Sequence, residues 1–254
     1  MPILNGLGAG FLVLGDKWMS DCLAVFLKLK QGTVIDIGVN LGLYMIKLKA
    51  LDQSRDYIGF EPNPVCNNFT QELIRANSFR NVRILPFALS DKKELRQFYI
   101  RRKGDKMGSL NEYARYGDAD KFSFELFTFP GDDFFDLLSL ERLCVMKIDV
   151  EGAELEVLAG LNETLKRYKP YLFCEIWQLP DASHPTYTEK LDRLGKICDL
   201  LKNIDYRILG VSISDPSNIF QLKSPVDFDG SHRRDFVLVH VSEESDLRQT
   251  IANI

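Results

Sequence analysis

Short apolar runs recur along the chain, and each is bounded by polar or glycine residues. Continuous apolar runs of this length are typical of strands in a parallel sheet that helices cover on both faces. The pattern predicts seven strands, at residues 33–37, 57–61, 82–89, 144–149, 170–177, 206–213 and 235–241. The short link between the last two allows antiparallel pairing, so we expect an antiparallel final strand.

Amphipathic segments alternate with these strands. Leu191, Leu194, Ile197 and Leu201, for example, repeat at the spacing that places them on one face of a helix. We expect helices at residues 16–30, 43–51, 64–77, 152–167 and 185–203. The alternation predicts an α/β fold with a mostly parallel sheet. We interpret residues 1–254 as a single domain, in which residues 1–30 form a helical lead-in.

One segment, residues 95–129, interrupts the alternation. It contains strand-like stretches at residues 97–100 and 122–129 around a polar, glycine-containing loop, which predicts an antiparallel hairpin insertion. We expect residues 107–110 of its loop to fold over the cleft at the strand ends. A basic run at residues 101–103 fits either a site for an anionic substrate or a solvated hairpin end.

Charge and cysteine content exclude some classes of protein. The net charge of −4 and a pI near 5.5 argue against a general nucleic-acid binder, which is usually basic. The five cysteines form no Cys-x-x-Cys pair, and Cys144 and Cys174 fall within expected strands, so we predict buried thiols in a reducing compartment. The apolar N-terminus has no basic region that would mark a secretory signal, and no run reaches membrane-spanning length. We therefore expect a cytoplasmic protein without a membrane span.

Three of the expected strands end in acidic residues beside glycine or proline. Residues 34–42 read Val-Ile-Asp-Ile-Gly-Val-Asn-Leu-Gly, residues 58–64 read Ile-Gly-Phe-Glu-Pro-Asn-Pro, and residues 145–154 read Val-Met-Lys-Ile-Asp-Val-Glu-Gly-Ala-Glu. A glycine turn after one strand and an acid at the tip of the next are the parts from which an α/β domain builds a nucleoside site. The carboxyl ends of these strands are therefore expected to form the rim of an active site.

In these stretches the chain resembles the FkbM-type S-adenosylmethionine-dependent methyltransferases. The resemblance covers residues 30–180 and rests on residues 34–42, 60–64, 88–91 and 147–160, the last of which is the most specific. It implies a Rossmann-like class I methyltransferase fold with S-adenosylmethionine as cofactor. It also suggests a sugar or a natural-product-like small molecule as the methyl acceptor.

The expected cofactor contacts lie in three segments. The pattern Asp36-x-Gly38-x-Asn40-x-Gly42 lacks the later glycines of a phosphate-binding fingerprint and suits a ligand with an ammonium group, which an acid attracts. In the alternative interpretation, Asp36 caps a turn and the glycines fit a tight bend. Glu61 is expected to accept hydrogen bonds from ribose hydroxyls, with Asn63 beside it. The resemblance places Leu89 and Ser90 beside the adenine, although an ordinary Ser-Asp turn fits this sequence too.

Asp149, Glu151 and Glu154 are the candidates for catalysis. A hydroxyl acceptor is a poor nucleophile until it loses its proton, so a nearby base is useful. Asp149 stands at the end of its expected strand and is the preferred candidate, because an acid at a helix start such as Glu154 also suits the helix dipole. Glu156 is interpreted as having mainly that structural role.

Further polar residues are candidates for acceptor binding. They are Ser109 in the insertion, Glu175 at the end of its strand, and the two loop histidines His184 and His232. A loop histidine or a strand-end acid is often only solvated, and His240 alternates with apolar neighbours, as a structural residue does. No spacing of histidine, cysteine and acidic residues specifies a zinc site, and a carboxylate-bound divalent ion is left open.

These features together predict an enzyme that transfers a methyl group from S-adenosylmethionine to a hydroxyl oxygen. The expected partner is a small-molecule or glycan acceptor, not a nucleic acid, and the sequence decides neither its identity nor the oligomeric state. One alternative is a nucleotide-dependent oxidoreductase on the same sheet, against which the incomplete phosphate fingerprint weighs. The other is a non-catalytic cofactor-binding protein, against which the acids at three strand ends weigh.

Overall fold

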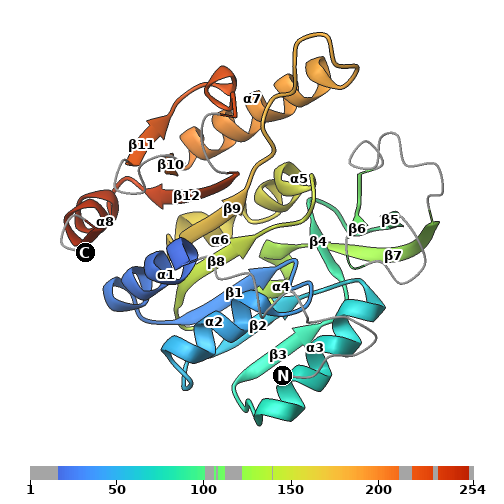
Figure 1. Ribbon diagram of the computed structural model, residues 1–254, viewed down its shortest axis with the longest axis vertical. Helices are drawn as coiled ribbons and strands as arrows, with labels where there is room; N and C mark the ends of the chain where they lie inside the picture. Colours follow the sequence, from blue (N-terminus) through green and yellow to red (C-terminus); the bar gives the residue numbers. More distant parts are fainter. Residues whose placement is uncertain are drawn as a thin grey trace.

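An eight-stranded sheet forms the centre of the protein (Figure 1). The computed structural model describes residues 17–100, 106, 108–111, 122–138, 140–211, 219–230 and 234–251. The strand order is β11-β10-β12-β9-β8-β1-β2-β3. Their bounds are Thr33–Ile37 (β1), Tyr57–Phe60 (β2), Val82–Leu85 (β3), Leu143–Ile148 (β8), Tyr171–Glu175 (β9), Tyr206–Val211 (β10), Ile219–Leu222 (β11) and Asp235–His240 (β12).

Five neighbouring strands, from β3 to β9, run parallel, with β1 between β2 and β8. Strand β12 is antiparallel to both β9 and β10, as expected for the final strand. All seven expected strands are present, so the predicted α/β fold is confirmed. The eighth, β11, pairs antiparallel with β10 and was not predicted, because its four residues carry no long apolar run.

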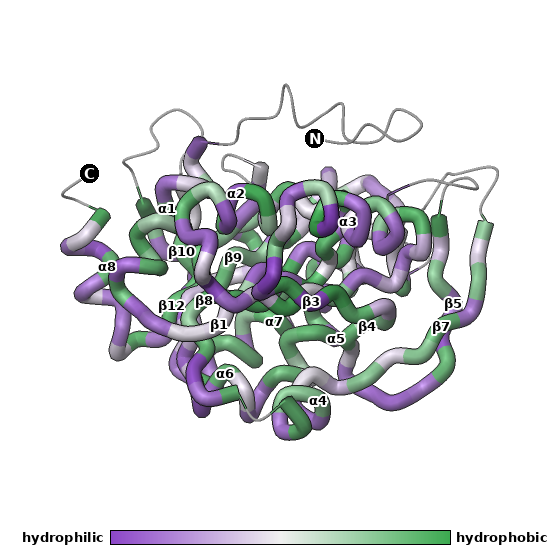
Figure 2. The backbone as a smooth tube through the Cα atoms, turned by 90° about the horizontal axis from the view of Figure 1, so that it is seen from below, coloured by the Kyte–Doolittle hydropathy of each residue, from purple (hydrophilic) through white to green (hydrophobic). Residues whose placement is uncertain are grey.

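Helices cover both faces of this sheet (Figure 2). On one side lie α1, α2 and α3, and on the other α4, α5 and α6. Helix α7 packs with α5, whereas α8 contributes Leu247 to the same cluster as α1. The bounds are Lys17–Leu29 (α1), Leu43–Leu51 (α2), Pro64–Asn77 (α3), Gly131–Leu138 (α4), Glu154–Ala159 (α5), Asn162–Tyr168 (α6), Tyr187–Asn203 (α7) and Glu244–Ile251 (α8).

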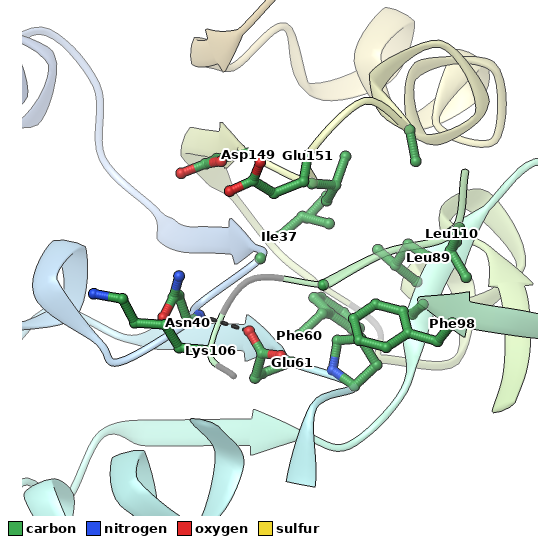
Figure 3. A pocket seen from close by; sticks show the side chains of 16 residues that line it. Ile37, Asn40, Phe60, Glu61, Leu89, Phe98, Lys106, Leu110, Asp149 and Glu151 are labelled. Atoms are coloured by element: carbon green, nitrogen blue, oxygen red, sulfur yellow. Dashed lines mark hydrogen bonds between the residues drawn. The ribbon is translucent and has the colours of Figure 1, made fainter. Parts of the chain in front are cut away.

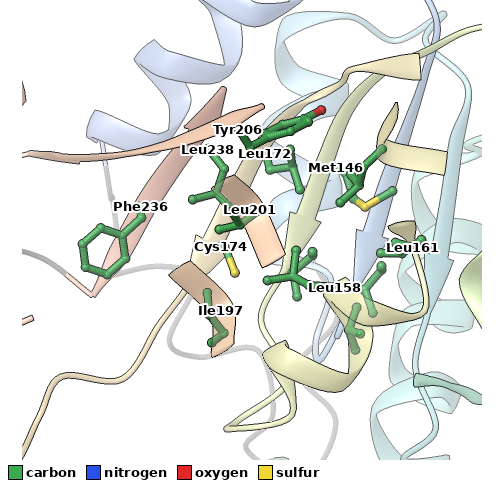
Figure 4. Packing of buried hydrophobic residues seen from close by; sticks show 14 of the residues in the cluster. Met146, Leu158, Leu161, Leu172, Cys174, Ile197, Leu201, Tyr206, Phe236 and Leu238 are labelled. Atoms are coloured by element: carbon green, nitrogen blue, oxygen red, sulfur yellow. The ribbon is translucent and has the colours of Figure 1, made fainter. Parts of the chain in front are cut away.

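The strands are apolar on both faces because each face packs against helices. In β9, Leu172 and Cys174 join the cluster under α5, α6 and α7, whereas Tyr171 and Phe173 join the cluster under α1 and α2. Figure 4 shows the first of these clusters, with Leu158 among the helical residues that meet the sheet. The predicted burial of Cys144 and Cys174 is confirmed, and the five cysteines are free thiols.

A second sheet of four strands, in the order β4-β7-β5-β6, contains the expected hairpin insertion. Its strands are Ala88–Ser90 (β4), Glu94–Ile100 (β5), Gly108–Ser109 (β6) and Phe122–Pro130 (β7). The strand expected at residues 82–89 is therefore wrong in extent, because the chain leaves the large sheet after Leu85 and β4 joins the second sheet. Pro86 explains the break, since it has no N–H group with which to continue the ladder.

The helix expected at residues 152–167 is also divided in two. Helix α5 ends before Gly160, and α6 begins at Asn162. A Cβ atom at Gly160 would lie 1.9 Å from the Ser90 carbonyl oxygen, so β4 presses directly against the chain at this point. Among the residues that the structure describes, no helix has the length and apolar character needed to cross a bilayer.

Gly160 gives a test of this packing. We expect Gly160→Ala to lower the free energy of unfolding by ~1–3 kcal/mol or more, since the methyl group would push β4 away from the α5–α6 junction. Gly195→Ala is the matched control, because in α7 its Cβ would meet only Pro225 Cγ, at 3.8 Å. It should raise stability by ~0.5–1 kcal/mol through helix propensity. Urea denaturation measures both, and equal effects would contradict the close contact.

Candidate active site

A cavity opens where the carboxyl ends of β1, β2 and β8 face the second sheet (Figure 3). Asp149 and Glu151 lie at one end of it, and Glu61 with Phe60 and Phe98 at the other. The carboxyl ends of parallel strands are the usual place for ligands in an α/β sheet. The complete lining is Ile37, Gly38, Asn40, Phe60, Glu61, Pro62, Ala88, Leu89, Phe98, Lys106, Gly108, Leu110, Asp149, Val150, Glu151 and Ala153.

The turn after β1 contributes backbone to this cavity. Gly38 has a φ of +86°, and a Cβ there would lie 1.8 Å from the carbonyl oxygen of Asp149, so only glycine lets β1 and β8 end this close together. Asn40 also has a positive φ, of 52°, and lines the cavity. Gly42 does not line it: this residue is the N-cap of α2 and faces Met45 and Leu73.

Glu61 is held rigidly at the end of β2. Its two carboxylate oxygens accept hydrogen bonds from the backbone N–H groups of Asn40, at 2.6 Å, and Asn63, at 2.8 Å. Burial raises the pKa of Glu61 to about 7, although the two amide donors favour its charged form. The side chain of Asn63 caps α3 by accepting from Val65 N at 3.0 Å, and Asn63 does not line the cavity.

Beneath the cavity, the side chain of Lys147 joins β1 to β8. Its Nζ lies 3.3 Å from Asp36 Oδ1, 3.2 Å from Asp149 Oδ2 and 3.1 Å from the carbonyl oxygen of Gly38. Burial alone would lower the pKa of Lys147, but Asp149 and Asp36 raise it above its usual value. Lys147 is therefore a buried ammonium ion with three acceptors.

Asp36, expected to contact a ligand, instead faces this lysine. Asp36 is fully buried, accepts a 2.5 Å hydrogen bond from the Tyr57 hydroxyl, and does not line the cavity. Burial raises the pKa of Asp36, while the Lys147 ammonium and the Tyr57 hydroxyl act in the opposite direction. Lys147 was not predicted as a site residue, although a lysine inside the otherwise apolar strand Leu143–Ile148 was a signal.

The turn after β8 is fixed to the second sheet. Glu151 has a φ of +54°, and its carbonyl oxygen accepts a 2.7 Å hydrogen bond from Ser109 Oγ. Next to it, the carbonyl oxygen of Gly152 accepts from Asn111 Nδ2 at 2.8 Å. Ser109 is buried and contacts this turn, whereas its neighbours Gly108 and Leu110 line the cavity.

Two other predicted acids have different surroundings from Asp149. Glu154 is buried at the start of α5, and its Oε1 accepts from Gly152 N at 3.0 Å, which braces the turn; burial raises its pKa to about 7. Glu175 ends β9, and burial together with the neighbouring Asp149 raises its pKa to about 9. Glu156 forms an ion pair with Arg193, in agreement with its expected structural role.

The remaining predicted residues are divided between the cavity and other places. Leu89 lines the cavity, but Ser90 is buried and its hydroxyl lies 3.2 Å from Asp91. His184 is exposed in the loop before α7, where its Nδ1 lies 3.0 Å from Thr186 Oγ1. His232, residues 101–105 and 107, and the N-terminal part of the lead-in lie outside the described residues. Within the described ranges, no group of His, Cys, Asp and Glu side chains is arranged to hold a metal ion.

The apolar wall of the cavity was predicted only in part. Phe60 of β2, Phe98 of β5 and Leu110 after β6 close the side opposite Asp149. Leu110 belongs to the segment at residues 107–110 that was expected to fold over the cleft, whereas the two phenylalanines were not expected there. Phe98 belongs to the insertion, and nothing in the sequence indicated which face of its strand would meet the cavity.

Comparisons with known proteins identify the family that the chain resembles. The model of the family described as Methyltransferase FkbM domain matches residues 36–208. A curated relative, methyltransferase sdnD of Sordaria araneosa, is 26% identical over 197 residues, which are 64% of this chain and 72% of that protein.

Solved structures of methyltransferases align with most of the chain at low identity. Methyltransferase FkbM from Methylobacillus flagellatus KT is 14% identical with a TM-score of 0.48, and the alignment covers 90% of this chain but only 56% of that one. A SAM-dependent methyltransferase from Aquifex aeolicus is 16% identical with a TM-score of 0.45, over 91% of this chain and 93% of the other.

The geometry around Lys147 leads to a stability prediction. We expect Lys147→Met to lower the free energy of unfolding by ~3–5 kcal/mol, because it leaves the buried Asp36 carboxylate without its cation. The loss should shrink as the pH falls, since burial already raises the pKa of Asp36 and protonation removes the uncompensated charge. Urea denaturation at several pH values measures it.

Two further variants make this test specific. The exposed Lys28→Met on α1 should change stability by less than ~0.5 kcal/mol. Adding Asp36→Asn to Lys147→Met should recover part of the loss, because the two residues are coupled. Strict additivity of the two substitutions would contradict a direct Asp36–Lys147 interaction.

Proposed function

This chain belongs to the FkbM methyltransferase family, and we propose that it transfers the methyl group of S-adenosylmethionine to a hydroxyl oxygen of a small molecule. The observation that carries the proposal is the Glu61 carboxylate, held by two backbone amides at the edge of the cavity. Methyl transfer and dependence on S-adenosylmethionine follow from the family. The hydroxyl acceptor and the roles of individual residues are our inference.

The residues of the cavity fit the parts of this cofactor. Each oxygen of Glu61 uses one lone pair for an amide and has another with which to accept from a ribose hydroxyl. Leu89, Phe98 and Phe60 offer apolar surface for the adenine. The turn from Gly38 to Asn40 lacks a phosphate fingerprint and lets the backbone approach the amino acid part of the ligand.

Asp149 is proposed as the base. When bound, S-adenosylmethionine supplies an electrophilic methyl carbon. Asp149 would take the hydroxyl proton of the acceptor as the acceptor oxygen bonds to this carbon and the carbon–sulfur bond breaks. Holding the two reactants in line removes much of the entropic barrier. We assign Glu151 to the acceptor side of the cavity, and Glu154 to bracing the turn through Gly152.

For the acceptor, we propose a sugar or natural-product-like molecule. Its contacts are proposed to include His184 and His232, together with the segment around Ser109. The net charge of −4 favours such a partner over a nucleic acid. We further infer a single methyltransferase domain in which the insertion at residues 95–129 acts as a substrate cap, since Ser109 and Asn111 of this insertion bond to residues 151–152. Free thiols at all five cysteines support a cytoplasmic location.

Thermal unfolding with added ligands tests the proposal directly. S-adenosylmethionine and S-adenosylhomocysteine should raise the melting temperature by binding the native state, whereas NAD should not. Transfer of labelled methyl groups to a panel of sugars and hydroxylated small molecules then tests the reaction. A shift with NAD alone would reject the cofactor assignment.

Glu61 gives the sharpest test of the cofactor site. Glu61→Ala is expected to weaken S-adenosylhomocysteine binding by ~1–3 kcal/mol, the contribution of hydrogen bonds to a charged group. Calorimetric titration measures the dissociation constant. Glu72→Ala, at a half-buried position on α3 outside the cavity lining, should leave it unchanged.

The same titration should depend on pH. Burial raises the pKa of Glu61 to about 7 in the free protein, and ribose hydroxyls favour the charged carboxylate, so affinity should increase as the pH rises from 6 to 8. Glu61→Ala should lose this dependence. A dissociation constant that Glu61→Ala leaves unchanged, in a folded protein, would remove Glu61 from the site.

Asp149→Asn separates chemistry from binding. It should lower turnover by ~10²–10⁴-fold, because the amide cannot take the hydroxyl proton, while S-adenosylhomocysteine affinity stays within ~3-fold. The measurements are methyl transfer to an accepted substrate and calorimetric titration of the same preparation. If turnover stays near that of the wild type, proximity alone carries the reaction. If both turnover and S-adenosylhomocysteine binding are lost, Asp149 belongs to the cofactor site.

A further inference from the structure

Polar side chains form a continuous line across four neighbouring strands of the large sheet. It runs from Tyr57 on β2 through Asp36 on β1 and Lys147 on β8 to Asp149. The Tyr57 hydroxyl lies 2.5 Å from Asp36 Oδ2, and Lys147 Nζ lies 3.3 Å from Asp36 Oδ1 and 3.2 Å from Asp149 Oδ2. Strands β8 and β9 pair in parallel with Ile148 opposite Cys174, so the next residues, Asp149 and Glu175, are also neighbours. Glu175 is therefore the outer end of the line, beside the proposed base.

The surroundings of Glu175 are strongly acidic. Burial, the charge of Asp149 and a hydrogen bond with its side chain raise the pKa of Glu175 to about 9, with Glu151 and Glu154 adding to the effect. On its other side, β12 places Asp235 opposite Glu175. Lys147 is the cation nearest to Glu175 along this line, and it contacts Asp149. At neutral pH Glu175 accordingly carries a proton, whereas Asp149 forms an ion pair with the Lys147 ammonium.

We propose that Glu175 is a positioning residue for methyl transfer, which in its protonated form donates a hydrogen bond to Asp149 and holds that carboxylate toward the acceptor. This inference rests on the proposed function of Asp149 as base. Glu175 and the Lys147 ammonium are the two donors that fix the Asp149 carboxylate. The carboxylate keeps further lone pairs with which to accept the hydroxyl proton.

The proton balance of this arrangement is simple. Before the reaction, Asp149 and Glu175 together hold one proton and one negative charge, as two neighbouring carboxyl groups often do. The acceptor hydroxyl gives its proton to Asp149 as its oxygen takes the methyl group, and Glu175 keeps its own proton throughout. If Glu175 loses its proton, the two carboxylates repel each other and Asp149 leaves its position.

The pH dependence of turnover in three proteins tests this role. For the wild type, kcat should fall above pH 9, where Glu175 ionises. Glu175→Gln keeps a donor that cannot ionise, so its turnover at pH 7.5 should stay within ~3-fold of the wild type and the alkaline fall should disappear. Glu175→Ala should lose turnover by ~10–100-fold at every pH, because Asp149 is no longer held.

Two controls keep this test independent of folding and of the proposed function. Glu163→Gln, at an exposed site on α6, should keep the alkaline fall. S-adenosylhomocysteine titration of each variant confirms an intact cofactor site. The inference is overturned if Glu175→Gln loses as much turnover as Glu175→Ala, or if wild-type kcat rises or stays level as the pH increases above 9. If the wild type transfers no methyl group to any hydroxyl acceptor, the proposed function itself fails.

Discussion

A single buried ammonium group, that of Lys147, connects the parts on which the site depends. Its three acceptors lie on β1, on the turn after β1 and at the end of β8. A charge buried this deeply is tolerated only when it is paired and its hydrogen bonds are satisfied. Because Asp36 and Asp149 both need this cation, the stability of the sheet and the orientation of the proposed base come from the same contacts.

The close approach of β1 and β8 has consequences for the whole rim. Residue 38 must be glycine because a Cβ there would overlap the Asp149 carbonyl oxygen. The turn after β8 adopts positive φ angles at Glu151 and Gly152. Ser109, in β6 of the second sheet, and the nearby Asn111 donate hydrogen bonds that fix this turn. The insertion is thus part of the support of the active site as well as a wall of the cavity, so substitutions within it are expected to affect both binding and chemistry.

Features encoded locally in the sequence were predicted well, and features that depend on tertiary contacts were not. The seven strands and the Gly38 turn follow from periodicity and from residues with special backbone freedom. The partner of Asp36 is 111 residues away in Lys147, and no local pattern specifies such a pair. The chain leaves the large sheet after Leu85 because β4 pairs with β7 in the second sheet. The helix expected at residues 152–167 is divided at Gly160 because β4 packs against the α5–α6 junction.

The buried acids near the strand ends, Glu61 and Glu154, lower the stability of the free protein at neutral pH. Burial raises the pKa of both Glu61 and Glu154 to about 7, from an ordinary value of 4.5. Ionising them in the folded protein is therefore unfavourable, and the free energy of unfolding falls as the pH rises from about 4.5 to 7. S-adenosylmethionine carries a sulfonium and an ammonium group. A cation in the cavity favours the charged form of Glu61, so this acid, which destabilises the free protein, would strengthen binding of the ligand at neutral pH, whereas Glu154 braces the turn outside the cavity lining.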